Sequence, residues 1–413
     1  MNTIINIESH EALKTSVEAC MALILQTKNQ DRIHEYLCID VKETFMRLKA
    51  MNSNKTLTIV SECKVKSSQS IGFLIDGKRT LGILKKLKPT DELTIELIKE
   101  TSKINFICKR FTQTIDFNEN WFDFEFVEKP DKQDGDKSYI FRTQLMKSVA
   151  SLSQKFKPVN NYNDVVFFGK TEGKTAIAIT DTIRLAYCIF PEDEDANSLG
   201  NIKDMAIPGH AFRIINRMLK NKEISKVPMI LLSVCESFQY SDNSIPEAET
   251  VRIELPCKSG KITMIVTLPN NGGFPDSFSK LIPKESKYSA VCEIKEFKNS
   301  LSLCKDVTTD SKNKVTMTFL STDEKLVISS SSRQDGYTNE ITSAVNGSKC
   351  ETDLISLDVD INSKFLTDAL IELGRTSSKV NIACISKLHP VIMTGNCTED
   401  GTELDWLIMP ILK

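Results

Sequence analysis

Apolar positions along this chain alternate between two periods, and the alternation recurs. Six times, a stretch with every second residue apolar, typical of a strand, precedes a stretch with the three- and four-residue spacing of an amphipathic helix. These stretches start at Thr3, Ser70, Tyr139, Met205, Ala290 and Ile355. Phe73 lies 68 residues after Ile5, Ala206 lies 66 after Ile140, and Leu357 lies 65 after Cys292. A unit with nearly constant internal spacing is therefore used three times.

Short alternating strands separated by Gly, Asn and Asp turns fill the segments between these helices, which predicts antiparallel sheet. Two polar segments with Pro and Gly, at Val127–Ser138 and Gly272–Ser286, are typical of linkers. We therefore expect three domains, at residues 1–130, 131–285 and 286–413. Each would pack two helices on antiparallel sheet, which is an α+β fold.

Basic residues gather on the predicted helices, although the 413-residue chain has a net charge of only −2. No acidic residue occurs between Arg142 and Asn163 or between Met205 and Lys222, whereas acids cluster at Glu192–Asp195. Like charges on one helix face repel each other, so such faces favour binding of phosphates. A solvated surface is the alternative for any single helix. The candidate DNA-facing residues are Lys78, Arg79, Lys85, Lys86, Arg142, Lys147, Lys155, Arg213, Arg217, Lys220, Lys295, Lys298 and Lys305.

Other chemistries find little support in the sequence. The twelve cysteines include no C-x-x-C pair, which argues against metal and favours buried, reduced thiols. The segment Gly169–Thr175 contains G-K-T twice, but its spacing is too short for a phosphate loop and a strand follows. We expect no catalytic site and no cofactor. The chain has neither a run of about 18 apolar residues nor a secretion signal at its start, so we expect a cytoplasmic protein without membrane contact.

Four places along the chain carry motifs of one known protein family. TDTIRLAYCIF (Thr180–Phe190) is similar to the family's T-D-x-x-R-L segment, and MAIPGHAFRIINRML (Met205–Leu219) to the strand and helix after it. GGFPDSFSKLIPK (Gly272–Lys284) is similar to the F-P-D-Y…P connector. HPVIMT (His389–Thr394) and WLIMPILK (Trp406–Lys413) are similar to the family's ending. Together, in order, these motifs resemble those of the bacterial DNA polymerase III beta subunit, the beta sliding clamp, and the chain is identified as a divergent member of that family.

The resemblance implies a ring of two head-to-tail subunits, with helices facing double-stranded DNA and sheets outside. It implies a non-enzymatic processivity factor for DNA replication. The expected partners are DNA, the catalytic subunit of DNA polymerase III, the clamp loader, other proteins with a clamp-binding motif, and a second copy of the chain. Without base-reading motifs, basic helices suit binding that ignores DNA sequence. An accessory clamp-like ring or DNA-binding scaffold that does not serve the main replicase stays open as the alternative.

The resemblance also implies a hydrophobic peptide-binding pocket between the middle and last domains. Two departures concern it: Thr182-Ile183 replaces a common Gly-His pair, and the chain ends M-P-I-L-K rather than M-P-M-R-L. A short extended peptide suits such an apolar groove, and the arginine could orient it. The residues carried over are Thr180, Arg184, Leu185, Pro275, Leu281, Val391, Leu407, Met409, Pro410 and Ile411.

Overall fold

The structure is a computed structural model of the 413-residue chain. It describes residues 2–24, 36–52, 56–88, 90–119, 137–156, 164–171, 174–189, 204–226, 228–238, 248–257, 260–269, 278–283, 285–305, 313–320, 325–334, 337–346, 348–352, 356–395 and 403–411.

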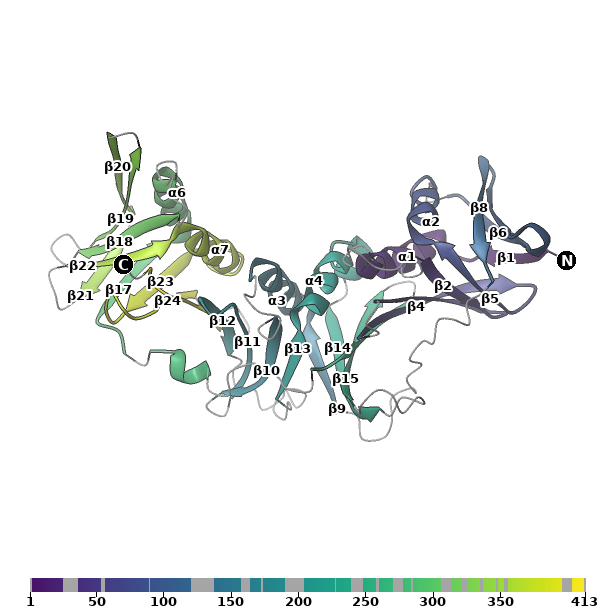
Figure 1. The fold of residues 1–413 in the computed structure, drawn as a ribbon, viewed down its shortest axis with the longest axis horizontal. Coiled ribbons are helices and arrows are strands. Elements are labelled where there is room, and N and C mark those ends of the chain that lie inside the picture. Colours follow the sequence, from purple (N-terminus) through teal and green to yellow (C-terminus); the bar gives the residue numbers. More distant parts are fainter. Residues whose placement is uncertain are drawn as a thin grey trace. The chain divides into compact units, whose positions relative to one another are not determined.

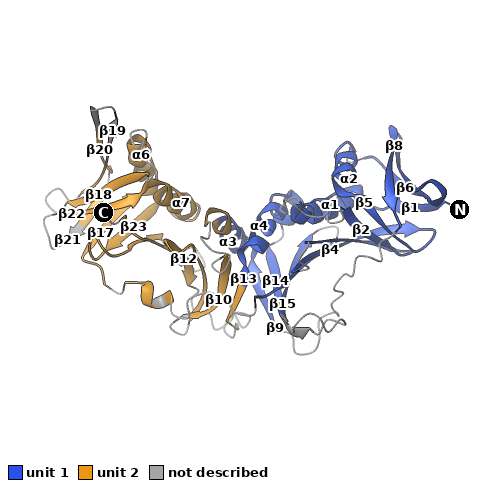
Figure 2. Cartoon of the chain, in the orientation of Figure 1, with its two compact units in different colours: residues 1–151, 207–271 blue, residues 152–206, 272–413 orange. Residues whose placement is uncertain are grey.

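The chain forms two compact units (Figure 2). Unit 1 comprises Met1–Ser151 and Ile207–Asn271, and unit 2 comprises Leu152–Ala206 and Gly272–Lys413. Each unit therefore holds part of the predicted middle domain. The predicted boundaries near residues 130 and 285 stay predictions.

Unit 1 is built on a twelve-stranded sheet with the order β1-β6-β7-β8-β5-β2-β3-β4-β16-β15-β14-β9 (Figure 1). The long strand β4 pairs with β3 on one side, and on the other with β16 in its first half and β1 in its second half. The elements are β1 (Thr3–Ile7), α1 (His10–Ile24), β2 (Tyr36–Val41), β3 (Phe45–Met51), β4 (Leu57–Ser67), β5 (Ile71–Asp76), α2 (Gly77–Leu84), β6 (Leu93–Ile98), η2 (Lys99–Thr101), β7 (Lys103–Cys108), β8 (Phe111–Asn118), β9 (Lys137–Arg142), α4 (Gly209–Met218), α5 (Lys222–Ser225), β14 (Met229–Phe238), β15 (Ala248–Cys257) and β16 (Gly260–Thr267).

Unit 2 contains a nine-stranded sheet, β13-β10-β11-β12-β25-β24-β23-β17-β21, and a four-stranded sheet, β20-β19-β18-β22. Helix α3 (Thr143–Lys155) and strand β13 (Met205–Pro208) each span the division between the units. The remaining elements are β10 (Val165–Thr171), β11 (Lys174–Thr180), β12 (Arg184–Ile189), η5 (Phe278–Leu281), β17 (Tyr288–Glu293), α6 (Ile294–Lys305), β18 (Lys314–Leu320), β19 (Lys325–Gln334), β20 (Tyr337–Ala344), β21 (Lys349–Thr352), β22 (Ser356–Asn362), α7 (Ser363–Leu373), β23 (Lys379–Cys384), β24 (Val391–Gly395) and β25 (Glu403–Ile408).

One pattern of strand exchange occurs three times. The strand before each helix pairs with a strand of the other half of its repeat: β1 with β6 and β5 with β2 in the first repeat. The second repeat pairs β9 with β14 and β13 with β10, and the third pairs β17 with β23 and β22 with β18. The predicted fold class, α+β with repeated helix-on-antiparallel-sheet elements, is confirmed.

The helices begin and end where local chemistry allows. The Asp76 side chain accepts a hydrogen bond from the Arg79 backbone N–H (2.9 Å), so α2 starts at Gly77. Helix α4 ends at Met218, and the Asn221 side chain caps the separate helix α5. Helix α3 ends at Lys155.

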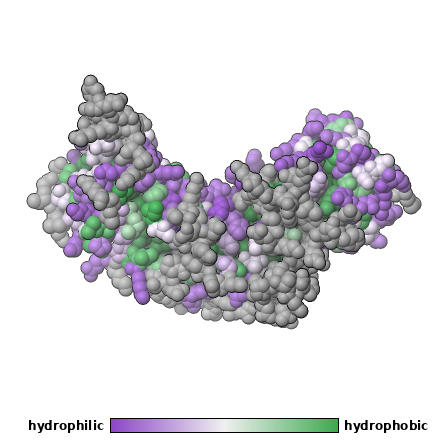
Figure 3. Space-filling view, in the orientation of Figure 1, coloured by the Kyte–Doolittle hydropathy of each residue, from purple (hydrophilic) through white to green (hydrophobic). Residues whose placement is uncertain are grey.

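Buried apolar faces join the helices to the sheets. In unit 1, α1 packs on β3 and β4 and also against α2 and α4. Leu13 and Val17 of α1 are buried, and the Ser16 and Ser61 hydroxyls hydrogen bond beneath it (2.8 Å). In unit 2, α6 and α7 lie side by side, with α6 on β19 and β20 (Figure 1). Figure 3 shows hydrophilic residues on the described surface of each unit, with patches of hydrophobic residues among them.

Two glycines in unit 1 should respond oppositely to a methyl group. Gly260 has φ +150°, and a Cβ there would meet the Glu62 carbonyl at 2.7 Å. Gly260→Ala should destabilise the protein by about 2 kcal/mol or more. Gly82, in α2, has nothing within 4 Å of such a Cβ. Gly82→Ala should stabilise by about 0.5–1 kcal/mol. Thermal unfolding followed by circular dichroism measures both, and equal shifts would contradict this account of the backbone.

Candidate functional site

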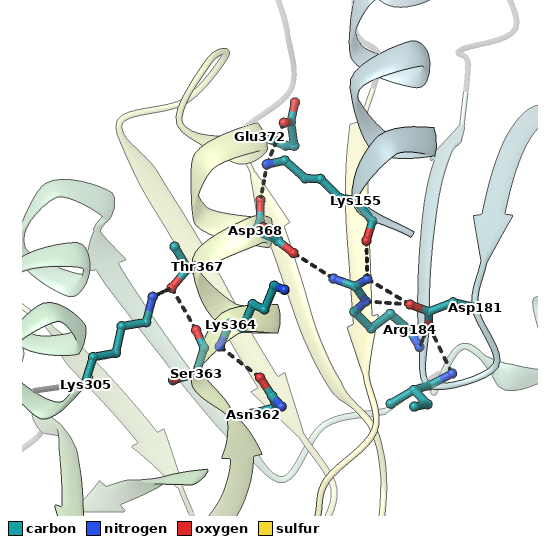
Figure 4. A network of polar contacts seen from close by, with 11 residues as sticks. Lys155, Asp181, Arg184, Lys305, Asn362, Ser363, Lys364, Thr367, Asp368 and Glu372 are labelled. Atoms are coloured by element: carbon teal, nitrogen blue, oxygen red, sulfur yellow. Dashed lines mark hydrogen bonds and ion pairs between the residues drawn. The ribbon is translucent and has the colours of Figure 1, made fainter. Parts of the chain in front are cut away.

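A buried arginine organises one end of the nine-stranded sheet in unit 2 (Figure 4). Arg184 opens β12 and is 4% exposed. Its Nε and Nη2 donate to Asp181 Oδ2 at 2.9 and 2.8 Å, and its Nη1 donates to Asp368 Oδ2 of α7 at 2.9 Å. Nη2 also donates to the Lys155 carbonyl at 2.7 Å. Two carboxylates and a backbone carbonyl offset the desolvation of this guanidinium.

Aromatic rings cover both sides of the same group. The Arg184 guanidinium lies 4.5 Å from the ring centroid of Phe156 and 4.2 Å from that of Phe365. Phe156 in turn contacts Trp406 of β25, with centroids 5.2 Å apart. Such cation–π contacts are strongest when shielded from water. A direct contact between Arg184 and a bound peptide, which the resemblance suggested, would require this arrangement to open.

The turn before β12 is held by side-chain hydrogen bonds. Asp181 Oδ1 accepts from the backbone N–H groups of Ile183 (3.2 Å) and Arg184 (2.8 Å). Thr180 Oγ1 donates to the Arg184 carbonyl (2.7 Å) and accepts from the Thr182 N–H (3.1 Å). Thr182 takes φ 74°, a left-handed conformation that is strained for a β-branched residue. These bonds stabilise the strained turn, which leaves the side chain of Ile183 43% exposed.

The C-terminal strand lies directly beside this turn. Strand β25 pairs with β12, with Leu407 opposite Leu185, and both side chains are 4% exposed. The Met409 N–H donates to the Ile183 carbonyl (3.0 Å), and the Met409 side chain is 41% exposed. Pro410 is buried, and the Ile411 N–H donates to the Asp360 carbonyl (2.7 Å). The segment is thus fixed at both ends, with Met409 facing outward.

The ten residues predicted for peptide binding fall into distinct groups. Leu185 and Leu407 belong to one apolar cluster with Phe278 of η5, while Val391 is fully buried opposite Ile408. Because these side chains are buried, they can support a binding surface but cannot contact a bound peptide directly. Leu281, also in η5, is 54% exposed. Pro275 lies outside the described residues.

Ile183, Asp181, Phe278 and Asp368 were not among the site residues predicted from the sequence, and Ile183 was noted only as a departure from the motif. Asp181 lay inside the recognised T-D-x-x-R-L segment, so its role was accessible from the motif. Phe278 lay inside the connector. Asp368 carries no signal in the sequence, because its importance depends on how α7 packs near β12.

The candidate DNA-facing residues of unit 1 are mostly on the surface. Among those that the structure describes as exposed are Lys78, Arg79, Lys85, Lys86, Arg142, Arg217 and Lys220, whereas Lys147 and Arg213 are half-buried. Lys147 Nζ donates to the Ser225 carbonyl (3.4 Å) and Arg217 Nη1 to the Ala22 carbonyl (3.5 Å). Helix α1 contacts both α2 and α4, and seven of these nine cations lie on α2 or α4 or within two residues after them.

In unit 2 the candidates divide into exposed and engaged cations. Lys295 is exposed and Lys298 is half-buried. Lys155 Nζ pairs with Glu372 Oε1 at 2.7 Å, and that carboxylate side chain is 0% exposed. Lys305 donates to the Thr367 hydroxyl, and desolvation lowers the pKa of its ammonium despite the opposing effect of Asp368. Lys155 and Lys305 therefore have partners within the protein, which the sequence did not indicate.

Buried thiols dominate the cysteines in the described part of the chain. Burial raises the pKa of Cys20, Cys188 and Cys384 to about 12, so these thiols are protonated and unreactive near neutral pH. No group of three or more His, Cys, Asp or Glu side chains among the described residues could hold a metal ion. Each helix of the described ranges is too short or too polar to span a bilayer.

The fold is that of the bacterial DNA sliding clamps. The DnaN sliding clamp (DNA polymerase III subunit beta) of Bartonella birtlesii, solved bound to griselimycin, is 15% identical with a TM-score of 0.78 over 100% of both chains. The DNA polymerase III subunit beta of Borrelia burgdorferi is 16% identical with a TM-score of 0.78 over 99% of both. The sliding clamp of Bacillus subtilis is 16% identical with a TM-score of 0.76 over 100% of both.

Sequence comparison identifies the family for the last third of the chain. Residues 279–411 match the family model "DNA polymerase III beta subunit, C-terminal domain". A search of curated proteins finds no match. The resemblance to the polymerase III beta subunit is confirmed, by sequence for the C-terminal domain and by fold for the whole chain.

Substituting Lys155 and Lys295 in turn distinguishes a lysine that stabilises the fold from one that lies on the surface. Lys155→Ala would leave Glu372 buried, with Arg375 at 2.9 Å as a remaining ion-pair partner. We expect a loss of about 2–3 kcal/mol, toward the low end for breaking a buried ion pair. Lys295→Ala, on the exposed face of α6, should change stability by less than about 0.5 kcal/mol. Calorimetric unfolding compares the two, and equal midpoints would show that the Lys155 pair contributes nothing.

Proposed function

We propose that this protein is a DNA sliding clamp, a ring that surrounds duplex DNA and tethers the replicative polymerase and other partners. The observation that supports this most is the sliding-clamp fold along the entire chain, combined with helices that carry exposed lysines and arginines. A ring holds DNA by topology, so individual phosphate contacts can stay weak and exchange during sliding. Such a protein needs no catalytic residues.

Ring closure requires two copies to join head to tail, and each unit has a strand edge suited to it. In unit 1, Phe111–Asp116 of β8 pairs with β7 and, among the described residues, has no strand on its other side. In unit 2, β20 ends the four-stranded sheet. Leu303 of the neighbouring helix α6 is 54% exposed. We propose that these edges pair between subunits, as a closed heterologous interface would require.

The surface near Ile183 and Met409 is the proposed site for partner peptides. Two exposed apolar side chains beside a rigid strand pair suit an apolar residue of an extended peptide. The relative from B. birtlesii binds griselimycin, and the fold supports testing the same compound on this chain. We propose the polymerase III catalytic subunit and the clamp loader as partners. No observation favours an accessory clamp over the main one.

Removing exposed cations on and just after α2 and α4 should weaken DNA association whatever the DNA sequence. The variant replaces Lys78, Lys85, Arg217 and Lys220 by Gln, all exposed. The slope of log affinity against log salt should fall by about one for each phosphate that the variant no longer neutralises. Anisotropy of short labelled duplexes measures affinity at several salt concentrations. Retention on nicked circular DNA after loading with a clamp loader measures the topological component.

A matched variant controls for overall charge. It replaces four exposed lysines on strands or turns of unit 1, namely Lys64, Lys66, Lys99 and Lys109, by Gln. This control should bind DNA nearly as the wild type does. Equal losses in both variants, or a loss limited to one DNA sequence, would contradict the proposed helix-lined surface.

Partner binding should depend on the two exposed apolar side chains. Ile183→Ala and Met409→Ala should each weaken binding of a fluorescein-labelled polymerase-tail peptide about tenfold, which corresponds to about 1.4 kcal/mol. Point variants are sharper than a C-terminal truncation, because truncation would also remove buried Pro410 and the Ile411–Asp360 hydrogen bond. Ile371→Ala, an exposed apolar residue on α7, is the control. Unchanged affinity in both site variants would place the peptide site elsewhere.

A further inference from the structure

Two exposed apolar side chains lie next to each other at the end of the nine-stranded sheet. Ile183 precedes β12 and Met409 follows β25, and a backbone hydrogen bond of 3.0 Å joins their main chains. Their exposed fractions are 43% and 41%, although the residues next in the chain, Arg184 and Ile408, are 4% and 0% exposed. The exposure of this pair therefore depends on the backbone conformation of the turn from Thr180 to Ile183.

A single carboxylate connects that turn to the buried guanidinium. Asp181 Oδ1 accepts from the Ile183 and Arg184 N–H groups, while Asp181 Oδ2 accepts from Arg184 Nε and Nη2. Any displacement of the Arg184 side chain would therefore also displace the Asp181 carboxylate, which holds the backbone of the turn. Thr182, with φ 74°, would then have a less strained backbone conformation available.

Helix α7 holds the other end of the guanidinium. Asp368 accepts from Arg184 Nη1 at 2.9 Å, and Phe365, one turn earlier, lies against the guanidinium at 4.2 Å. The Lys155 carbonyl accepts a further hydrogen bond, and the Lys155 ammonium pairs with Glu372, also on α7 (Figure 4). The side chain of Arg184 is only 3% exposed, so it cannot present a charge to a partner.

We infer that Arg184 is a positioning residue for partner binding: through Asp181 and Asp368 it fixes the Ile183–Met409 pair relative to α7 without contacting the partner. This inference rests on the proposed peptide site. Substitutions of Asp368 or Phe365 on α7 therefore alter peptide affinity, because they release the turn. Helix α7 thus helps to set the affinity of the Ile183–Met409 pair for the peptide.

The first test follows the turn itself, without any ligand. Asp368→Asn removes the charge that α7 presents to Arg184 and keeps the side chain nearly the same size. Hydrogen–deuterium exchange, read by mass spectrometry on fragments spanning Ile408–Ile411, reports the Met409 amide that donates to Ile183. We expect exchange at least tenfold faster in Asp368→Asn. Asp368→Glu, which keeps the carboxylate, should restore much of the protection.

The matched control removes a different charge from the same helix. Lys364 is exposed on α7, and Lys364→Gln should leave the exchange of Met409 unchanged. If Asp368→Asn does not fold, Phe365→Leu gives a milder change, since it removes one aromatic face from Arg184. Unchanged protection of Met409 in a folded Asp368→Asn or Phe365→Leu variant overturns the inference, even if the melting temperature falls.

The second test connects the turn to binding. Affinity for the labelled polymerase-tail peptide should fall three- to tenfold in Asp368→Asn, and the loss should disappear when Met409→Ala is already present. A full additional loss in the Met409→Ala background would show that the peptide contacts the network directly, which overturns the positioning role. If the wild type binds no such peptide while Met409 exchange still responds to Asp368→Asn, the proposed peptide site fails, and the positioning of the turn stands.

Discussion

Exchange of strands between the two halves of each repeat is the constraint on which this structure depends. A half-repeat alone would deprive its first strand of one hydrogen-bonded neighbour, and unpaired backbone groups away from water are costly. Pairing β1 with β6 and β5 with β2 satisfies both halves at once, and the third repeat does the same with β17, β22 and their partners. The pairings β4–β16 and β12–β25 then extend the sheets from one repeat to the next. Continuous sheet across predicted domain limits explains why the compact units cut through the middle repeat.

Buried charge has a different role in unit 2. Arg184, Asp181, Asp368, Lys155 and Glu372 are held by each other and by the aromatic rings of Phe156 and Phe365. Apolar residues of similar volume could provide comparable stability, because buried ion pairs recover their desolvation cost only with good geometry. Apolar packing, however, is not directional, whereas hydrogen bonds are. Hydrogen bonds from one guanidinium to a turn, a helix end and α7 fix the position of a short surface segment that includes Ile183.

The same network decides which basic side chains are available to bind a partner. Lys155 and Lys295 are indistinguishable as helix-face lysines in the sequence, yet one pairs with a fully buried glutamate and the other is exposed. An ammonium that already compensates a buried carboxylate is costly to redirect toward a phosphate. For the DNA binding proposed above, exposed cations such as those of α2 are therefore better candidates than basic residues that already have partners within the protein.

The sequence by itself determined the repeated strand–helix order, the α+β class and the family resemblance, because periodicity and short motifs are local properties of the chain. It also located the segments around Thr180 and Met409 that the structure brings side by side. Only the tertiary structure decided that Leu185, Val391 and Leu407 are core, that Arg184 is enclosed, and that Asp368 holds it. Burial and ion pairing depend on which elements pack together. No spacing in the sequence specifies that a residue of α7 meets one from β12, more than 180 positions earlier.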